Sequence, residues 1–147
     1  MILGFKNQFI LPIINGEKVH TIRQDINNRW RVGMNIHFVT GARTKNYNQF
    51  FSGKCVSIQR FAMFRPAIGF GDGSIVELSL RVQINGRDIS EDVLRELVKN
   101  DGFDNVEDFI SFFKESFFGK IIHWTDYKYN DTGKKGKKPL GQPDRSV

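Results

Sequence analysis

The chain has 147 residues, of which 39% are hydrophobic and 14 are phenylalanines, a composition typical of one folded domain. This apolar content is too high for a disordered chain, and a domain of this length buries enough surface to form one core. The single cysteine, Cys55, excludes an internal disulfide and therefore a secreted disulfide-rich scaffold. The sequence has neither an apolar run of the roughly 20 residues that span a bilayer nor a signal-peptide pattern at its start. We therefore expect a soluble, cytoplasmic protein with no membrane partner.

Positive charge is concentrated at the C-terminal end. The net charge is +6, and the segment from Lys128 onward contains six Lys or Arg and two Asp residues, which gives it +4 of that excess. Such a tail attracts polyanions nonspecifically, but its composition is equally consistent with a solvated tail that only keeps the protein in solution. Because residues 130–147 lack apolar periodicity, we predict a domain at 1–127 and a basic, flexible tail at 128–147.

The first third of the chain predicts short strands and one short helix. Residues 1–5 are short and apolar, which indicates a strand, and residues 7–15 favour a short helix that ends at Gly16. Residues 18–23 are expected to be extended, and residues 35–40 have the alternation of a strand.

The middle of the chain predicts antiparallel strands after a polar, basic loop at 41–48. Residues 54–60 alternate, with Val56 and Ile58 on one face, and residues 74–84 alternate over a longer stretch. The apolar face of the longer segment consists of Val76, Leu78, Leu80, Val82 and Ile84. Polar residues fill its other face, as is typical of a half-buried antiparallel strand.

Two helices and a closing strand are predicted at the end of the domain. Ser90 is the expected N-cap of a helix at 91–100, and a capping-box pattern that begins at Asp104 precedes a helix at 105–115. Residues 120–124 have the composition of a final strand. This order predicts an α+β domain whose mostly antiparallel strands curl into a small barrel with helices on its flanks.

The common catalytic motifs are absent, but one segment combines side chains that carry chemistry. There is no P-loop and no nucleophile elbow, and the three histidines and one cysteine lack metal-ligand spacing, so we expect neither a cofactor nor a metal. In an extended segment Thr21 and Arg23 project to the same side, and Lys18 reaches toward them through a turn. This cluster of donors suits a phosphate or a carbonyl oxygen, although such residues more often form a solvated turn.

The same segment resembles a signature of the ASCH domain family, whose fold is similar to that of the PUA domain. The pattern is G-x-K-x-x-T-x-R, formed here by Gly16, Lys18, Thr21 and Arg23. The Asn-Asp-Gly-Phe segment at 100–103, with an acidic helix start and a closing strand after it, is also similar to that family. The resemblance covers about residues 1–127 and implies a small PUA-like β-barrel with an RNA-binding cleft beside the first helix.

Some small ASCH proteins are amidohydrolases that remove the acetyl group from N4-acetylcytidine with a Thr nucleophile, a Lys base and an assisting acid. The resemblance assigns the first two roles to Thr21 and Lys18. Asp101 is the nearest counterpart of the acid, which is a Glu in those enzymes, and Glu77 is a second candidate. A Lys takes the proton of a Thr hydroxyl when burial or a neighbouring cation, here Arg23, lowers its pKa.

Two further groups of residues have the composition of a nucleic-acid-binding surface. Arg43, Lys45 and Tyr47 place cations beside an aromatic ring in a loop, and Trp30 lies between two arginines; an ordinary surface loop and a packed ring are the alternatives. We predict an ASCH-domain protein that binds RNA or a modified nucleoside in the Lys/Thr/Arg cleft. An amidohydrolase acting on an acylated cytidine is the alternative, followed by a ribonuclease and a protein-interaction module.

Overall fold

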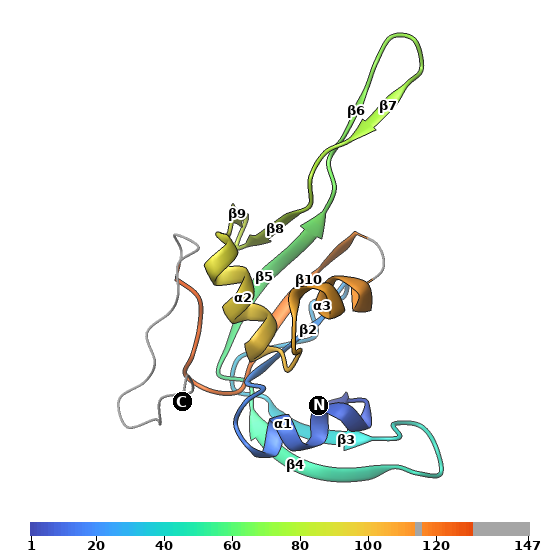
Figure 1. The fold of residues 1–147 in the computed structure, drawn as a ribbon. Helices are drawn as coiled ribbons and strands as arrows, with labels where there is room; N and C mark the ends of the chain where they lie inside the picture. Colours follow the sequence, from blue (N-terminus) through green and yellow to red (C-terminus); the bar gives the residue numbers. More distant parts are fainter. Residues whose placement is uncertain (114–115, 131–147) are drawn as a thin grey trace.

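The computed structural model describes residues 1–113 and 116–130, so most of the predicted tail, including all of 131–147, lies outside the described residues. The described strands form a three-stranded sheet, a five-stranded sheet and a two-stranded hairpin (Figure 1). The predicted α+β class and the mostly antiparallel pairing are confirmed. The strands described here form no closed barrel, because the two larger sheets share no ladder of hydrogen bonds.

The three-stranded sheet contains the N-terminus of the chain. Its strands, in spatial order, are β1 (Ile2–Gly4), β3 (Asn35–Thr40) and β4 (Asn48–Lys54). β1 pairs with β3 in parallel, and β3 pairs with β4 in antiparallel with a bulge between Phe38 and Val39. The strand expected at 35–40 is confirmed, but its alternation holds only to Phe38, because Val39 and Thr40 after the bulge are both buried.

The five-stranded sheet is antiparallel throughout and positions the segment that carries the sequence signature. Its strands, in spatial order, are β2 (His20–Arg23), β10 (Phe117–His123), β5 (Ser57–Phe64), β8 (Arg81–Ile84) and β9 (Arg87–Asp88). β10 lies between β2 and β5 and pairs with both, with Ile122 opposite Thr21 and His123 opposite His20. Because Ile121 and Ile122 are fully buried, β2 is anchored to the core of the domain.

The strand predicted at 54–60 is wrong in its extent and in its buried face. β4 ends at Lys54, and the chain then leaves the first sheet for the second. The Cys55 amide donates to the carbonyl of Met34, which precedes β3, and the Val56 amide donates to the carbonyl of His123 in β10. This transition changes the side-chain phase. The buried face of β5 therefore contains Gln59, Phe61 and Met63 rather than Val56 and Ile58.

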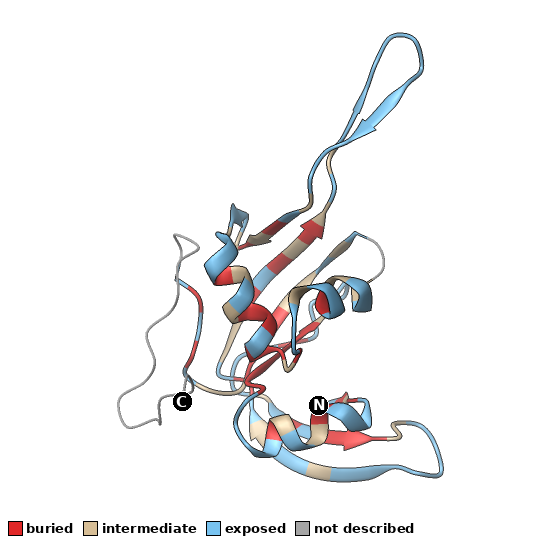
Figure 2. Cartoon of the chain, viewed as in Figure 1, coloured by how far each residue is buried: buried red, intermediate tan, exposed pale blue. Residues whose placement is uncertain are grey.

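The long strand predicted at 74–84 is two separate strands. β7 (Ile75–Glu77) pairs with β6 (Ala67–Gly69) in a hairpin that projects from the rest of the molecule, and every residue of these two strands is exposed (Figures 1 and 2). The second strand is β8, and it packs against the core, with Val82 and Ile84 buried as expected. An alternating pattern does not distinguish a strand on the core from one half of a projecting hairpin, since both use the same backbone period.

Two of the helices begin at side-chain caps. Ser90 caps α2 (Glu91–Asn100) as predicted, by accepting a hydrogen bond from the Val93 amide at 3.2 Å. The cap of α3 (Val106–Phe113) is Asn105, which accepts from the Asp108 amide at 2.8 Å, and not Asp104 as predicted. The cap is therefore one residue further along the chain than the capping-box pattern indicated.

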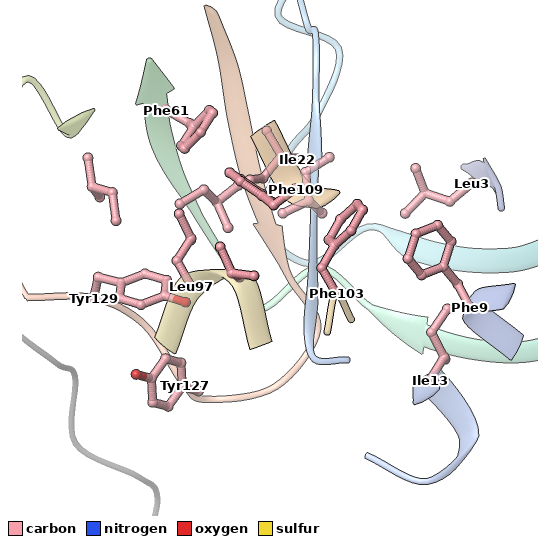
Figure 3. Close-up of a cluster of buried hydrophobic side chains, with 14 of the residues drawn as sticks. Leu3, Phe9, Ile13, Ile22, Phe61, Leu97, Phe103, Phe109, Tyr127 and Tyr129 are labelled. Carbon is pink, nitrogen blue, oxygen red and sulfur yellow. The ribbon is translucent and has the colours of Figure 1, made fainter. Parts of the chain in front are cut away.

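The core joins the helices to the face of the five-stranded sheet and continues toward the N-terminal strand. Figure 3 shows buried side chains from α2, α3, β5 and β2, together with Tyr127 and Tyr129 from the C-terminal segment. Both tyrosines are at most 2% exposed, so the packed chain extends to at least Tyr129, two residues beyond the predicted boundary. Among the described residues, no helix is long and apolar enough to cross a membrane.

Candidate functional site

A cavity of about 560 Å³ lies between the N-terminal strand, β2 and the region around α3. It contains four of the residues singled out from the sequence: Lys18, Thr21, Arg23 and Asp101. Its apolar wall is formed largely by six phenylalanines, Phe5, Phe9, Phe103, Phe112, Phe113 and Phe117. A pocket of this volume, with apolar walls and a few converging polar groups, has the properties of a small-molecule site.

Backbone hydrogen bonds hold Lys18 where the N-terminal helices turn into β2. After the short helices η1 (Asn7–Phe9) and α1 (Ile10–Ile14), Gly16 adopts a φ of +76°, which favours glycine. The Pro12 carbonyl then accepts the amides of both Glu17 and Lys18 at 2.9 Å. The backbone carbonyl of residue 12 therefore supplies the acceptor that fixes the start of the signature segment.

Asp101 reaches the same place from the end of α2. The Val19 amide donates to the Asn100 carbonyl at 2.9 Å, which ties the signature segment to the helix terminus. Gly102 has a φ of +90°, and a Cβ there would lie 3.1 Å from Lys18 Cδ and 3.2 Å from the Phe9 ring. Glycine at 102 thus allows both the left-handed turn that ends α2 and the close approach of the Lys18 stem.

Lys18 and Asp101 form an ion pair that is almost completely buried. Lys18 Nζ donates to the Asp101 carbonyl at 2.6 Å and to Asp101 Oδ1 at 3.1 Å, and the two side chains are 2% and 5% exposed. The ammonium also lies 4.8 Å from the centre of the Phe9 ring. Loss of water on burial lowers the pKa of Lys18 below its usual 10.5, although the Asp101 carboxylate opposes that shift.

Thr21 is paired with Arg23 rather than with Lys18. Arg23 Nε donates to Thr21 Oγ1 at 3.1 Å, its Nη2 donates to the Gly4 carbonyl at 2.6 Å, and its guanidinium lies over the Phe5 ring at 4.9 Å. Burial lowers the pKa of Arg23 from its usual value, and Asp101 opposes this shift. In the described part of the chain, Lys18 Nζ makes hydrogen bonds to Asp101 and none to the Thr21 hydroxyl.

His20 is a site residue that the sequence analysis missed. Its Nδ1 lies 3.1 Å from Asp101 Oδ1, and its Nε2 lies 2.8 Å from the hydroxyl of Tyr129. Lys18 and His20 are two residues apart in an extended segment, so alternation alone places them on the same side. That signal could have identified His20, whereas the contact with Tyr129 joins residues too distant in the sequence for any local pattern.

The other predicted binding residues lie outside the cavity. Trp30 is 7% exposed and belongs to the core, so it is not part of an open nucleic-acid surface. Arg43, Lys45 and Tyr47 are exposed in the loop between β3 and β4, which borders the cavity through Ala42. Glu77 lies exposed on β7 of the projecting hairpin, and the carboxylate in the cavity is that of Asp101.

Comparison with protein-family models, with curated proteins and with solved structures finds no match to this chain. Within residues 1–113 and 116–130, no group of three or more His, Cys, Asp or Glu side chains is arranged to hold a metal ion. The residues that line the cavity are therefore the basis for inferring a function.

A second buried histidine supports the sheet next to this site. His123 on β10 is fully buried, and its Nε2 lies 3.0 Å from Gln59 Oε1, which also accepts the Tyr129 amide at 3.0 Å. Burial, reinforced by nearby His20 and Lys128, lowers the pKa of His123 from 6.5 to about 2. In the unfolded chain the imidazole binds its proton near pH 6.5, so below that pH the unfolded state binds one proton more than the folded state.

We therefore predict that the folded protein loses stability as the pH falls below 6.5, by on the order of 1 kcal/mol per pH unit from His123. His123→Gln keeps an amide donor near Nε2 but does not titrate, so its free energy of unfolding should fall less between pH 7 and pH 5. Urea unfolding at the two pH values measures the difference. His37→Gln, at an exposed position on β3, is the control and should behave as the wild type does. Equal slopes for His123→Gln and the wild type would contradict the prediction.

Proposed function

We propose that the protein binds RNA or a nucleotide-like ligand, with one base inserted in the cavity that contains Lys18, Thr21, Arg23 and Asp101. The observation that carries this proposal is the combination of a phenylalanine wall with two buried or partly buried cations in one cavity. Aromatic rings stack on nucleobases, and cations contact phosphates and carbonyl oxygens.

The aromatic wall favours a flat, uncharged ring as the part of the ligand that enters. Phe9, Phe103 and Phe112 contact one another edge to face, with ring centres 5.3 to 6.4 Å apart. Phe112 is itself 43% exposed, so this wall continues from the cavity to the surface. A base that enters would exchange water for contact with these rings, which is worth roughly 1–3 kcal/mol for each stacked base.

The polar side of the cavity favours a ligand with both acceptors and donors. The Lys18 ammonium and the Arg23 guanidinium are donors, whereas the Asp101 carboxylate is an acceptor and the Thr21 hydroxyl is both. The rim supplies further positive charge, since Lys6 lines the cavity and Arg43 and Lys45 follow Ala42 in the adjoining loop. These cations suit the phosphates of a strand that continues away from the bound base.

The resemblance of Gly16, Lys18, Thr21 and Arg23 to the ASCH signature supports the same proposal, and with it a PUA-like relationship for the fold. Three signature side chains line one cavity, and Gly16 forms the turn before them. The order of elements, with a strand and short helices before the signature, agrees with what the resemblance implies.

A second candidate function is removal of the acyl group from an acylated cytidine. It is favoured by the position of the Thr21 hydroxyl in the same cavity as a buried lysine whose pKa is lowered. Thr21 Oγ1 would bond to the acyl carbon and lose its proton to Lys18 in its neutral form. The bond between that carbon and the cytidine amine would break as the amine takes a proton, and water would then hydrolyse the threonine ester. Lys18 Nζ would have to turn from Asp101 toward Thr21 for this step.

Binding is tested with cytidine 5′-monophosphate and a short single-stranded RNA. Arg23→Ala should weaken binding of both by about tenfold, because it removes a charge-assisted contact inside the cavity. Alanine at both Arg43 and Lys45 should weaken only the RNA and reduce its salt dependence by about two phosphate contacts. Arg95→Ala, at an exposed cation on α2, is the control. Equal binding by Arg23→Ala and the control would contradict the proposal.

Turnover of N4-acetylcytidine separates the two candidate functions. If the protein is an amidohydrolase, the wild type releases cytidine, and Thr21→Ala and Lys18→Ala each lose most of the activity because the nucleophile and the base act together. If it only binds, no cytidine forms, and Thr21→Val affects RNA binding less than Lys18→Ala does, because phosphate binding depends on charge. Turnover that persists in Thr21→Ala would show that Thr21 is not the nucleophile.

A further inference from the structure

A chain of buried hydrogen bonds leads from the C-terminal segment to the carboxylate in the cavity. Asn100 Nδ2 donates to the Tyr129 hydroxyl at 3.2 Å, this hydroxyl lies 2.8 Å from His20 Nε2, and His20 Nδ1 lies 3.1 Å from Asp101 Oδ1. All four residues are between 0% and 3% exposed. None of Asn100, His20 and Tyr129 lines the cavity, so they act on a ligand through Asp101.

With Asp101 ionised and His20 neutral, the donors and acceptors in this series of hydrogen bonds match in one direction only. An ionised carboxylate only accepts, so His20 Nδ1 carries the proton that it shares with Asp101 Oδ1. In a neutral imidazole, Nε2 then accepts from the Tyr129 hydroxyl, whose oxygen accepts from Asn100. Burial raises the pKa of Tyr129 well above 10, which keeps its hydroxyl protonated for this role.

These hydrogen bonds leave the two oxygens of Asp101 in different environments. Oδ1 accepts hydrogen bonds from both Lys18 and His20. Among the described residues, no hydrogen bond reaches Oδ2, although Asp101 lines the cavity. A carboxylate held at one oxygen by two donors cannot rotate without breaking both bonds, so Oδ2 is the acceptor that a ligand meets.

We propose that Tyr129 and His20 are positioning residues that fix the Asp101 carboxylate so that Oδ2 accepts a hydrogen bond from an N–H group of the ligand, such as the exocyclic amine of a nucleobase. This inference rests on the proposed function of the cavity. It gives the C-terminal segment, which follows the last strand, an indirect effect on the binding site through Asp101.

The backbone of Tyr129 is held independently of its hydroxyl. Gln59 on β5 donates to the Tyr129 carbonyl at 2.5 Å and accepts from the Tyr129 amide at 3.0 Å. The ring packs edge to face on Tyr127, with centres 5.3 Å apart. Tyr129→Phe therefore keeps the backbone bonds and the ring contact and removes only the hydroxyl.

The test compares Tyr129→Phe with Tyr127→Phe in the full chain. Tyr127→Phe removes a hydroxyl from the same segment, but not one from the chain of hydrogen bonds that ends at Asp101. Cytidine, which carries an exocyclic amine, is the ligand probe, and calorimetry measures its affinity. Long-range ¹H–¹⁵N spectra of the ligand-free protein, which has three histidines, report which ring nitrogen of His20 carries the proton.

We expect the wild-type spectrum to show His20 protonated at Nδ1. Tyr129→Phe should keep this tautomer, because Asp101 Oδ1 still accepts from Nδ1, but its His20 Nε2 resonance should shift with the loss of the hydroxyl donor, and it should bind cytidine about tenfold more weakly. Tyr127→Phe should match the wild type in both measurements. A His20 protonated at Nε2 in the wild type would overturn the proposal, as would a Tyr129→Phe variant with an unchanged Nε2 resonance and unchanged cytidine affinity.

A second pair of variants tests the positioning role even if Tyr129→Phe does not fold. His20→Asn keeps an amide donor near the position of Nδ1 and should retain more cytidine affinity than His20→Ala; equal losses would overturn the positioning role. If the wild type does not bind cytidine at all, the proposed function fails for this ligand. The His20 Nε2 resonance in Tyr129→Phe then decides alone, since a resonance equal to that of the wild type would overturn the positioning role.

Discussion

The ion pair between Lys18 and Asp101 connects two distant segments of the domain, and the local structure on both sides accommodates it. Lys18 precedes β2 near the N-terminus, and Asp101 follows α2, so the pair joins segments 83 residues apart. Burial of two charges costs several kcal/mol for each ion unless geometry and further hydrogen bonds compensate. Here a backbone carbonyl, His20 and the ring of Phe9 all contact the pair. Residue 102 has to be a small one, because a Cβ there would lie only 3.1 Å from Lys18 Cδ.

This arrangement gives a polar centre to a cavity that is otherwise aromatic. The same phenylalanines that fill the core near α3 reach the cavity, where they replace water around Lys18 and Arg23 and lower the pKa values of both. Charged groups in such surroundings interact more strongly with a ligand than they would in water. A buried ion pair adds little stability compared with apolar residues of similar size, so stability alone does not account for this pair.

Local patterns in the sequence predicted the parts of the structure that depend on local interactions. The cap at Ser90, the glycine turn at Gly16 and the alternation at the start of 35–40 are settled within a few residues. The signature also identified Lys18, Thr21 and Arg23, which do share one cavity. The sequence could not show that the chain changes sheets at Cys55, because that transition depends on partners in distant strands. For the same reason it could not show that Trp30 is packed in the core or that Tyr129 contacts His20.

The most direct test of this account is a double variant, Lys18→Met with Asp101→Asn, in which the charges are removed and an acceptor for His20 is kept. Its free energy of unfolding and its affinity for cytidine 5′-monophosphate are measured together. We predict a stability within about 1 kcal/mol of the wild type, because the cost of burying the charges disappears with them, and a loss of at least about tenfold in affinity. A double variant that is strongly destabilised but binds the nucleotide as tightly as the wild type would show that the pair serves the fold and not a ligand.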